Sequence, residues 1–260
     1  MSRLIFWITT SFALLFLAVP LLLVLPLAFN DSSFLNYPME GFSLRWFEEA
    51  LISGRWPHYF FNSLKVAFGA MIVGLLIGGL AATGVMLTGR FMQIVLSALF
   101  VSPLVVPSIV LGVAFTYSYS RIGLAGNYFG LVIAHAVLGV PLVFLSIMTS
   151  LRGLDPDLDL AAASLGASRA HRFWHVTLPL ATPGFLAGGL LAFITSFDEV
   201  VVALFLASPE STTLPVALFS GLRDRLDPTV VVVALLLSVL SLALLWLLSR
   251  LQHLGGHTSA

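Results

Sequence analysis

Residues 159–184 read DLAAASLGASRAHRFWHVTLPLATPG, and they constrain the fold more than any other stretch of this chain. Three consecutive alanines, Ala161 to Ala163, give a helix a smooth, low-profile face on which another protein can lie close. Gly166 can end or bend that helix, because glycine adopts a left-handed turn without a steric penalty. Ser168 suits the N-cap of a second short helix. The stretch therefore predicts two short helices joined by a turn.

The stretch belongs to a polar segment, residues 151–183, that lies between two long apolar runs. Pro179 and Pro183 are expected to limit how far the second helix continues and to redirect the chain into the next apolar run. Helical spacing and basic side chains indicate helices outside the membrane; the basic side chains are Arg152, Arg169, His171, Arg172 and His175. We call residues 151–183 the knuckle, and we expect a partner protein in the aqueous phase to grip it.

The composition places the rest of the chain in lipid. Of 260 residues, 59% are hydrophobic and 9% are charged, and the mean hydropathy is +1.04. Soluble proteins carry about a quarter charged residues, so a water-soluble globule is excluded. The net charge of zero provides no basic field for nucleic acid. The chain has no cysteine, which excludes disulfides, thiol nucleophiles and zinc–thiolate clusters.

Motifs of catalysis are also missing. The sequence has no GxxxxGK[ST] nucleotide loop, no HExxH and no GxSxG elbow. We therefore expect no catalytic residue, no metal site and no cofactor in this chain.

Apolar runs long enough to cross a bilayer core of about 30 Å occur six times. Such runs must be helical, because the hydrocarbon offers no hydrogen-bond partner for the backbone. The predicted fold is therefore all-α and polytopic, a single transmembrane domain over residues 1–260 with spans at about 5–29, 63–88, 92–119, 128–150, 184–207 and 229–249. We expect the first run to be a span, since it is longer than the apolar part of a secretory signal peptide.

Small residues recur four apart on two of these spans. Ala70, Gly74 and Gly78 share one face of the second span, and Gly184 and Gly188 share one face of the fifth. Such faces let helix backbones approach closely, which predicts packing within the chain.

The sidedness of the chain follows only weakly from its charges. Six spans put both termini on one side, and each side then holds six Lys and Arg residues. Leaving out the long loop 30–62 and its edge favours termini inside, by six to three.

The spacing in the knuckle resembles the EAA loop of the membrane subunits of bacterial ABC importers. That pattern has Glu-Ala-Ala, a glycine four positions after the second alanine, and aliphatic-x-Leu-Pro after nine more residues. The positions are matched by Ala161, Ala162, Gly166, Val176, Leu178 and Pro179. The leading acid is replaced by Leu160, with Asp159 just before it, so any salt bridge made by that acid is left open.

The resemblance implies a type I importer fold with a cytoplasmic coupling helix, and both termini would then be cytoplasmic. It also implies partners: two copies of an ATP-binding subunit that holds ATP and Mg, a second homologous permease subunit, and a periplasmic substrate-binding protein at the bacterial inner membrane. The residues expected to couple to the ATPase are Asp159, Ala161, Ala162, Gly166, Ala167, Ser168, Arg169, Val176, Leu178 and Pro179. A merely amphipathic interfacial helix remains the alternative.

A second resemblance concerns the substrate. Residues 195–201, residues 211–215 and the turn at 223–228 resemble permeases of the spermidine/putrescine type. Importers of ferric iron, thiamine, opines or aminophosphonates remain alternatives. The loop 30–62 is a candidate docking surface for the binding protein, or an interfacial lid; its aromatic residues are Phe34, Tyr37, Trp46 and Trp56.

Three ionisable residues are expected inside spans. Asp198 and Glu199 fall near the middle of the fifth span, where each ionised acid costs roughly 2.5–3.5 kcal/mol. Either they face a hydrated pathway for a cationic substrate, or the helix starts later and they lie at its end or pair with another subunit. His135 of the fourth span is a further pathway candidate, or a hydrogen-bonded packing residue.

Two other classes of membrane protein fit the sequence less well. A secondary transporter driven by an ion gradient calls for inverted repeats, which the sequence does not show. An intramembrane hydrolase built on His135 and Asp198 has too few chemical groups within the spans.

Overall fold

The structure, a computed structural model, describes residues 2–224 and 228–255, and these are almost entirely helical. The predicted all-α class is thus confirmed for the described part of the chain, where the one β feature is an isolated bridge between Asn30 and Phe42. Contacts divide the chain into two compact units, Met1–His58 with Ala217–Leu244 and Tyr59–Val216 with Leu245–Ala260.

The first unit starts with a long apolar helix and a loop anchored by one tryptophan. Its elements are α1 (Ser2–Val24), η1 (Leu25–Phe29), α2 (Arg45–Glu48), η2 (Glu49–Ser53), the later part of α11 (Leu214–Asp224) and most of α12 (Pro228–Gly255). Trp46 is buried, and its indole Nε1 donates to the Asn30 carbonyl oxygen at 2.8 Å. Of the loop aromatics, Phe34 and Tyr37 remain exposed, so only part of the expected docking surface is available.

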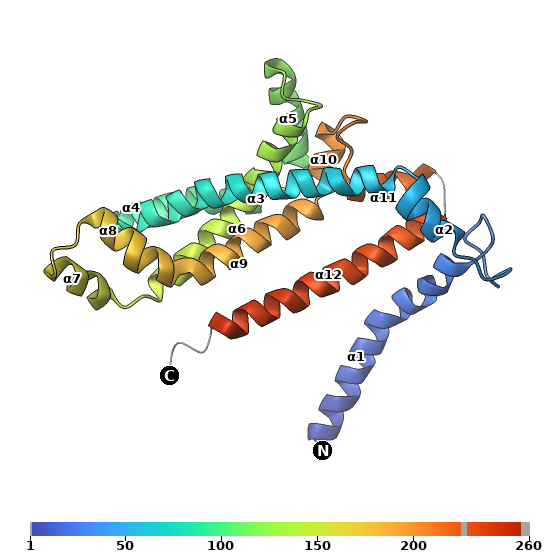
Figure 1. Cartoon of the computed structure of the whole chain (residues 1–260), viewed down its shortest axis with the longest axis horizontal. Helices are drawn as coiled ribbons and strands as arrows, with labels where there is room; N and C mark the ends of the chain where they lie inside the picture. Colours follow the sequence, from blue (N-terminus) through green and yellow to red (C-terminus); the bar gives the residue numbers. More distant parts are fainter. Residues whose placement is uncertain (1, 225–227, 256–260) are drawn as a thin grey trace. The chain divides into compact units, whose positions relative to one another are not determined.

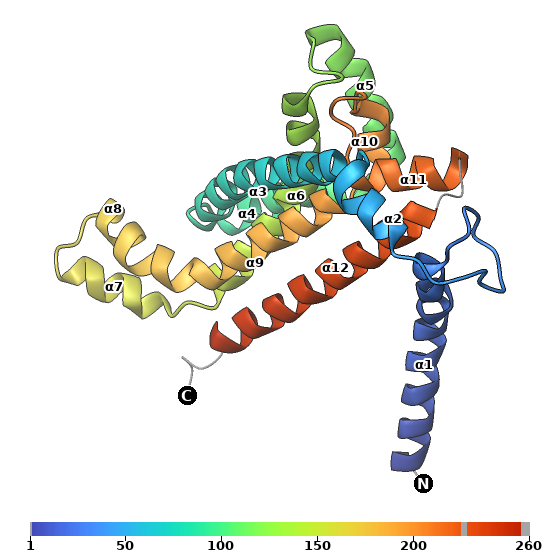
Figure 2. The same ribbon diagram turned by 45° about the vertical axis from the view of Figure 1, so that its right-hand side comes forward.

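The second unit is organised around three long helices that lie side by side (Figures 1 and 2), α3 (Trp56–Met86), α6 (Tyr128–Arg152) and α9 (Leu178–Phe197). Glycines of α3 and α9 both contact Val143 of α6. A Cβ added at Gly78 would lie 2.9 Å from the Val143 side chain, and one at Gly188 would lie 2.9 Å from its Cα. The prediction that the small residues pack helices within the chain is confirmed.

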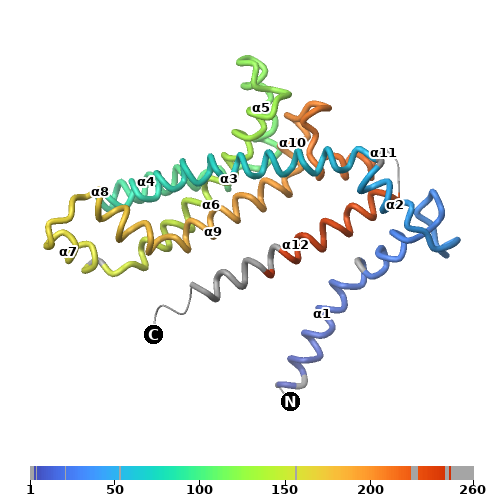
Figure 3. The backbone as a smooth tube through the Cα atoms, in the orientation of Figure 1, coloured from blue at the N-terminus to red at the C-terminus, as the bar shows by residue number. Residues whose placement is uncertain are grey.

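The third predicted span, 92–119, is not one straight helix. It consists of α4 (Arg90–Val101), η3 (Ser102–Val105) and α5 (Ser108–Ile122), with a bend of 97° between the two halves. Pro103 and Pro107 flank the bend, and neither can donate the N–H that a continuous helix needs. In Figure 3, α5 stands off the layer formed by α3, α6 and α9.

The fifth predicted span, 184–207, is also corrected. The knuckle holds α7 (Pro156–Ser164) and α8 (Arg169–Arg172), and a π-helical turn, η4 (Phe173–Thr177), joins α8 to α9 without a break. Pro179 does not end the helix; it comes just after the π-helical turn η4, where the regular α-helical hydrogen-bond pattern is already interrupted. Pro183 lies inside α9, which ends at Phe197, and α10 (Val201–Leu206) is separate.

Among the described residues, four helical stretches are long and apolar enough to cross a membrane, or five if the bent pair counts as one span. The four are Ile5–Phe29, Trp56–Met86, Tyr128–Arg152 and Arg169–Phe197. The expected sixth span corresponds to α12, whose apolar stretch Pro228–Ala243 is shorter. Residues 225–227 of the predicted turn lie outside the described residues.

Candidate functional site: the knuckle and the far end of α9

The turn of the knuckle has the geometry that its sequence predicts. Gly166 is left-handed at φ 85°, the N–H of Gly166 donates to Ala163, and the N–H of Ala167 donates to Ala162, which together form a Schellman motif. The hydroxyl of Ser168 accepts from the N–H of His171 at 3.3 Å and caps α8. Both local predictions, a helix end at Gly166 and an N-cap at Ser168, are confirmed.

An ion pair that sequence reasoning left open joins the two short helices. The Arg172 Nη1 lies 3.2 Å from Oδ2 of Asp159, so the acid next to Leu160 is held by the knuckle itself. Leu160 itself is exposed, and its apolar side chain cannot take part in an ion pair.

The outer surface of the knuckle combines small, apolar and basic side chains. Leu165 is 89% exposed, and Leu158, Leu160 and Trp174 are also exposed. Apolar side chains exposed outside the membrane mark surfaces that partners cover. Of the residues expected to couple, the exposed ones are Asp159, Ala161, Gly166, Ser168, Arg169 and Pro179, and the half-buried ones are Ala162, Ala167, Val176 and Leu178.

α9 connects the knuckle to the acidic pair. Its 20 residues span about 30 Å, close to the thickness of the hydrocarbon core. The helices α7 and α8 of the knuckle precede the N-terminal end of α9 (Figure 3). Asp198 and Glu199 follow Phe197, the last residue of α9. The two predicted groups of site residues are therefore held at opposite ends of one helix.

The acidic pair does not lie in the middle of a span as expected, because α9 both begins and ends earlier than the predicted span 184–207 and stops at Phe197. Asp198 is the C-cap of α9 and is exposed, with no hydrogen bond or ion pair to its carboxylate among the described residues. Glu199 is half-buried, and its Oε1 accepts from the N–H of Val202 at 2.9 Å in the first turn of α10. Asp198 is thus free for a ligand, whereas Glu199 holds the start of a helix.

His135 lies in a buried hydrogen bond, as the packing alternative predicts. Its Nδ1 is 2.8 Å from Oγ of Ser196 and 3.2 Å from the Ser196 carbonyl oxygen, while its Nε2 has no partner among the described residues. The contact joins α6 to the end of α9, two residues before Asp198. Ser196 was not predictable as the partner of His135 from local patterns, since the two residues are 61 positions apart.

The loop after α10 is tied to the same end of the unit. The Asn62 side-chain amide donates to the carbonyl oxygens of Glu210 and Thr212, both at 2.9 Å, and Ser63 Oγ accepts from the N–H of Leu214. These contacts across about 150 residues were not predictable from local patterns.

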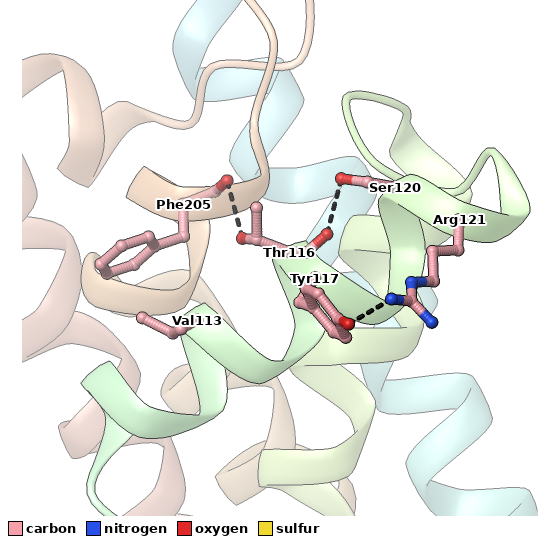
Figure 4. A pocket seen from close by; sticks show the side chains of 6 residues that line it. All are labelled: Val113, Thr116, Tyr117, Ser120, Arg121 and Phe205. Carbon is pink, nitrogen blue, oxygen red and sulfur yellow. Dashed lines mark hydrogen bonds between the residues drawn. The ribbon is translucent and has the colours of Figure 1, made fainter.

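A groove of about 530 Å³ lies between α5 and α10 and is lined by Val113, Thr116, Tyr117, Ser120, Arg121 and Phe205 (Figure 4). The hydroxyls of Thr116 and Ser120 donate to backbone carbonyls, and the guanidinium of Arg121 donates to the Tyr117 hydroxyl. The positive charge of Arg121 opposes a cationic ligand. No group of three or more potential metal-ligating His, Asp or Glu side chains occurs in the described part of the chain.

Comparison with known proteins supplies independent findings. Residues 74–253 match the family model of the binding-protein-dependent transport system inner membrane component. The spermidine/putrescine transport system permease protein PotC of Haemophilus influenzae is 30% identical over 93% of this chain and 94% of its own. The putrescine transport system permease protein PotI of Escherichia coli K12 is 30% identical over 85% of this chain and 81% of its own.

A solved structure shares the fold. A bacterial ABC transporter involved in the import of the acidic polysaccharide alginate aligns with a TM-score of 0.73 and 14% identity, over 99% of this chain and 96% of the matched one.

Proposed function

Because the chain belongs to the inner-membrane components of binding-protein-dependent transport systems, and is a multi-pass permease subunit of an ABC importer, we propose that it carries a polyamine such as spermidine or putrescine. The observation that supports this proposal most is the arrangement along α9. The knuckle lies at one end of this helix, and the unpaired carboxylate of Asp198 lies at the other.

The chain itself performs no catalysis in this proposal. A separate ATP-binding subunit, present in two copies, binds ATP and Mg and closes on the knuckle. The knuckle and both termini of the chain lie in the cytoplasm. The exposed alanine, glycine and leucine residues of the knuckle suit such an interface, because the small ones leave the backbone accessible and the leucines offer apolar area. A second homologous permease subunit completes the pathway, and a periplasmic binding protein delivers the substrate.

At the C-terminal end of α9, Asp198 attracts the cationic substrate. Glu199 lines the pathway and also accepts a hydrogen bond from the first turn of α10. His135 supports the end of α9 through its hydrogen bond to Ser196. The polyamine assignment is supported by the names of two relatives at 30% identity and by the free carboxylate. Ferric iron, thiamine, opines and aminophosphonates are the competing substrates.

The test is substrate-stimulated ATP hydrolysis by the complete complex reconstituted in vesicles, with spermidine, putrescine and each competing substrate. We compare wild type with Gly166→Asp, which puts a charged side chain on a left-handed residue in the turn of the knuckle. Gly123→Asp is the matched control, since Gly123 is also left-handed at φ 72° and has nothing within 4 Å of its Cβ position.

Loss of complex assembly or of stimulation in Gly166→Asp alone would support the coupling role. Equal behaviour of the two variants would remove it. Stimulation by another substrate but by neither polyamine would overturn the substrate assignment and leave the importer function standing.

A further inference from the structure

Besides the turn at Gly166, a second contact, between Asp159 and Arg172, holds α7 and α8 of the knuckle together. Arg172 Nη1 lies 3.2 Å from the Asp159 carboxylate and 3.4 Å from the Asp159 carbonyl oxygen. The Arg172 side chain is only 19% exposed, although it lies on an aqueous segment. Because the two residues are 13 positions apart, the contact exists only while the turn brings α7 against α8.

Arg172 lies inside the knuckle, at the point where α8 passes into the helix that continues to α9. It is the last residue of α8 and directly precedes η4, which continues into α9. The turn at Gly166 is held by its own two hydrogen bonds, which connect residues of α7 and the turn but do not reach Arg172. A second attachment, from Asp159 to Arg172, ties α7 to the end of α8.

We infer that Asp159 and Arg172 are positioning residues that make α7, the turn and the start of α9 move as one body, so that a pull on the knuckle reaches the membrane. The inference rests on the proposed coupling function of the knuckle. A loose α7 would still bind the ATPase but would absorb its motion instead of transmitting it.

The geometry distinguishes this role from a general one of acidic residues on α7. Asp157 is on the same helix and is exposed, yet its side chain makes no ion pair among the described residues. Since partly exposed ion pairs add little to folding free energy, the effect of breaking the pair is expected in coupling and not in folding.

The measurement is the number of substrate molecules imported per ATP hydrolysed by the complete complex in vesicles. Asp159→Asn and Arg172→Gln should each lower this ratio about 3- to 10-fold, the range typical of residues that carry coupling between sites. Asp157→Asn, the matched control, should keep the wild-type ratio. The charge swap, Asp159→Arg with Arg172→Asp, should recover part of the loss, and all variants should unfold thermally within a few degrees of the control.

Several outcomes would overturn the inference. The first is a ratio in both single variants equal to that of Asp157→Asn. The second is a charge swap as poor as the single variants, which would show that the ion pair is not the cause. The third is a loss of thermal stability that parallels the loss of coupling, which would make the pair structural. A wild-type complex without substrate-dependent ATP hydrolysis would instead contradict the proposed function itself.

Discussion

Asp198 and Glu199 are adjacent in sequence, but their carboxylates have different surroundings. Glu199 accepts a hydrogen bond from Val202, whereas Asp198 is exposed and unpaired among the described residues. A helix end is also a cheaper place for an ionised acid than the middle of a span, because it lies closer to water. Glu199 therefore supports the start of α10, and in the proposed transport of a cation Asp198 is the carboxylate that remains to attract it.

The division predicts a difference between two amide variants. Asp198→Asn should raise the KM for the polyamine in stimulated ATP hydrolysis about 3- to 10-fold, because it removes a charge that meets the cation. Glu199→Gln should change KM less, since the amide oxygen can still accept from Val202. A larger KM change in Glu199→Gln would reverse the assignment of the free acid.

Among the elements, α6 forms the centre against which α3 and α9 pack. Gly188 approaches Val143 so closely that an added methyl group would lie 2.9 Å from backbone, which cannot move aside as a side chain can. We predict that Gly188→Ala lowers the free energy of unfolding by about 1–3 kcal/mol. Thermal unfolding of the purified chain in detergent measures this.

Gly84 of α3 provides the control for that prediction, because no atom lies within 4 Å of its Cβ position. Gly84→Ala should be neutral or stabilise by up to about 1 kcal/mol, as alanine favours a helix over glycine. Unfolding of the two variants at the same temperature would contradict the close contact between α6 and α9 at Gly188.

Some of these elements can be predicted from the sequence better than others, because some depend on neighbouring residues and others on distant contacts. The turn at Gly166 and the cap at Ser168 depend on a few neighbouring residues, so local chemistry suffices to predict them. Hydropathy measures only the length of an apolar run. It therefore missed the bend near Pro103, where apolar residues continue on both sides. It also carried the fifth span past Phe197, because the two acids that follow are only a short interruption before Val200 to Leu206. The Asp159–Arg172 pair depends on the turn that folds the knuckle, so only the three-dimensional structure reveals it.

Across the whole molecule, the apolar helices are buried to very different extents. Within the second unit, 61% of the most apolar window of α6 is buried, but only 39% of that of α3 and 33% of that of Arg169–Phe197, so these two leave much apolar surface exposed. A polytopic subunit of a larger importer is expected to have such faces, because its remaining contacts come from outside the chain.

The path of the bent pair α4–α5 determines on which side of the membrane the later segments of the chain lie. If the pair crosses the membrane once, the loop containing Phe34 and the knuckle containing Leu165 lie on opposite sides. If the pair enters and leaves on the same side, they lie on one side. The chain has no cysteine, so Phe34→Cys and Leu165→Cys each introduce a single reactive thiol at an exposed position.

We predict that a membrane-impermeant maleimide labels Phe34→Cys from the periplasmic face of spheroplasts and labels Leu165→Cys only in inverted vesicles. This follows because an odd number of crossings separates the two positions when the bent pair counts as one span. Permeabilised membranes, in which both thiols should react, serve as the control. Labelling of both variants from one face would make α4–α5 a re-entrant segment, and labelling of Leu165→Cys in spheroplasts would place the knuckle outside the reach of a cytoplasmic ATPase.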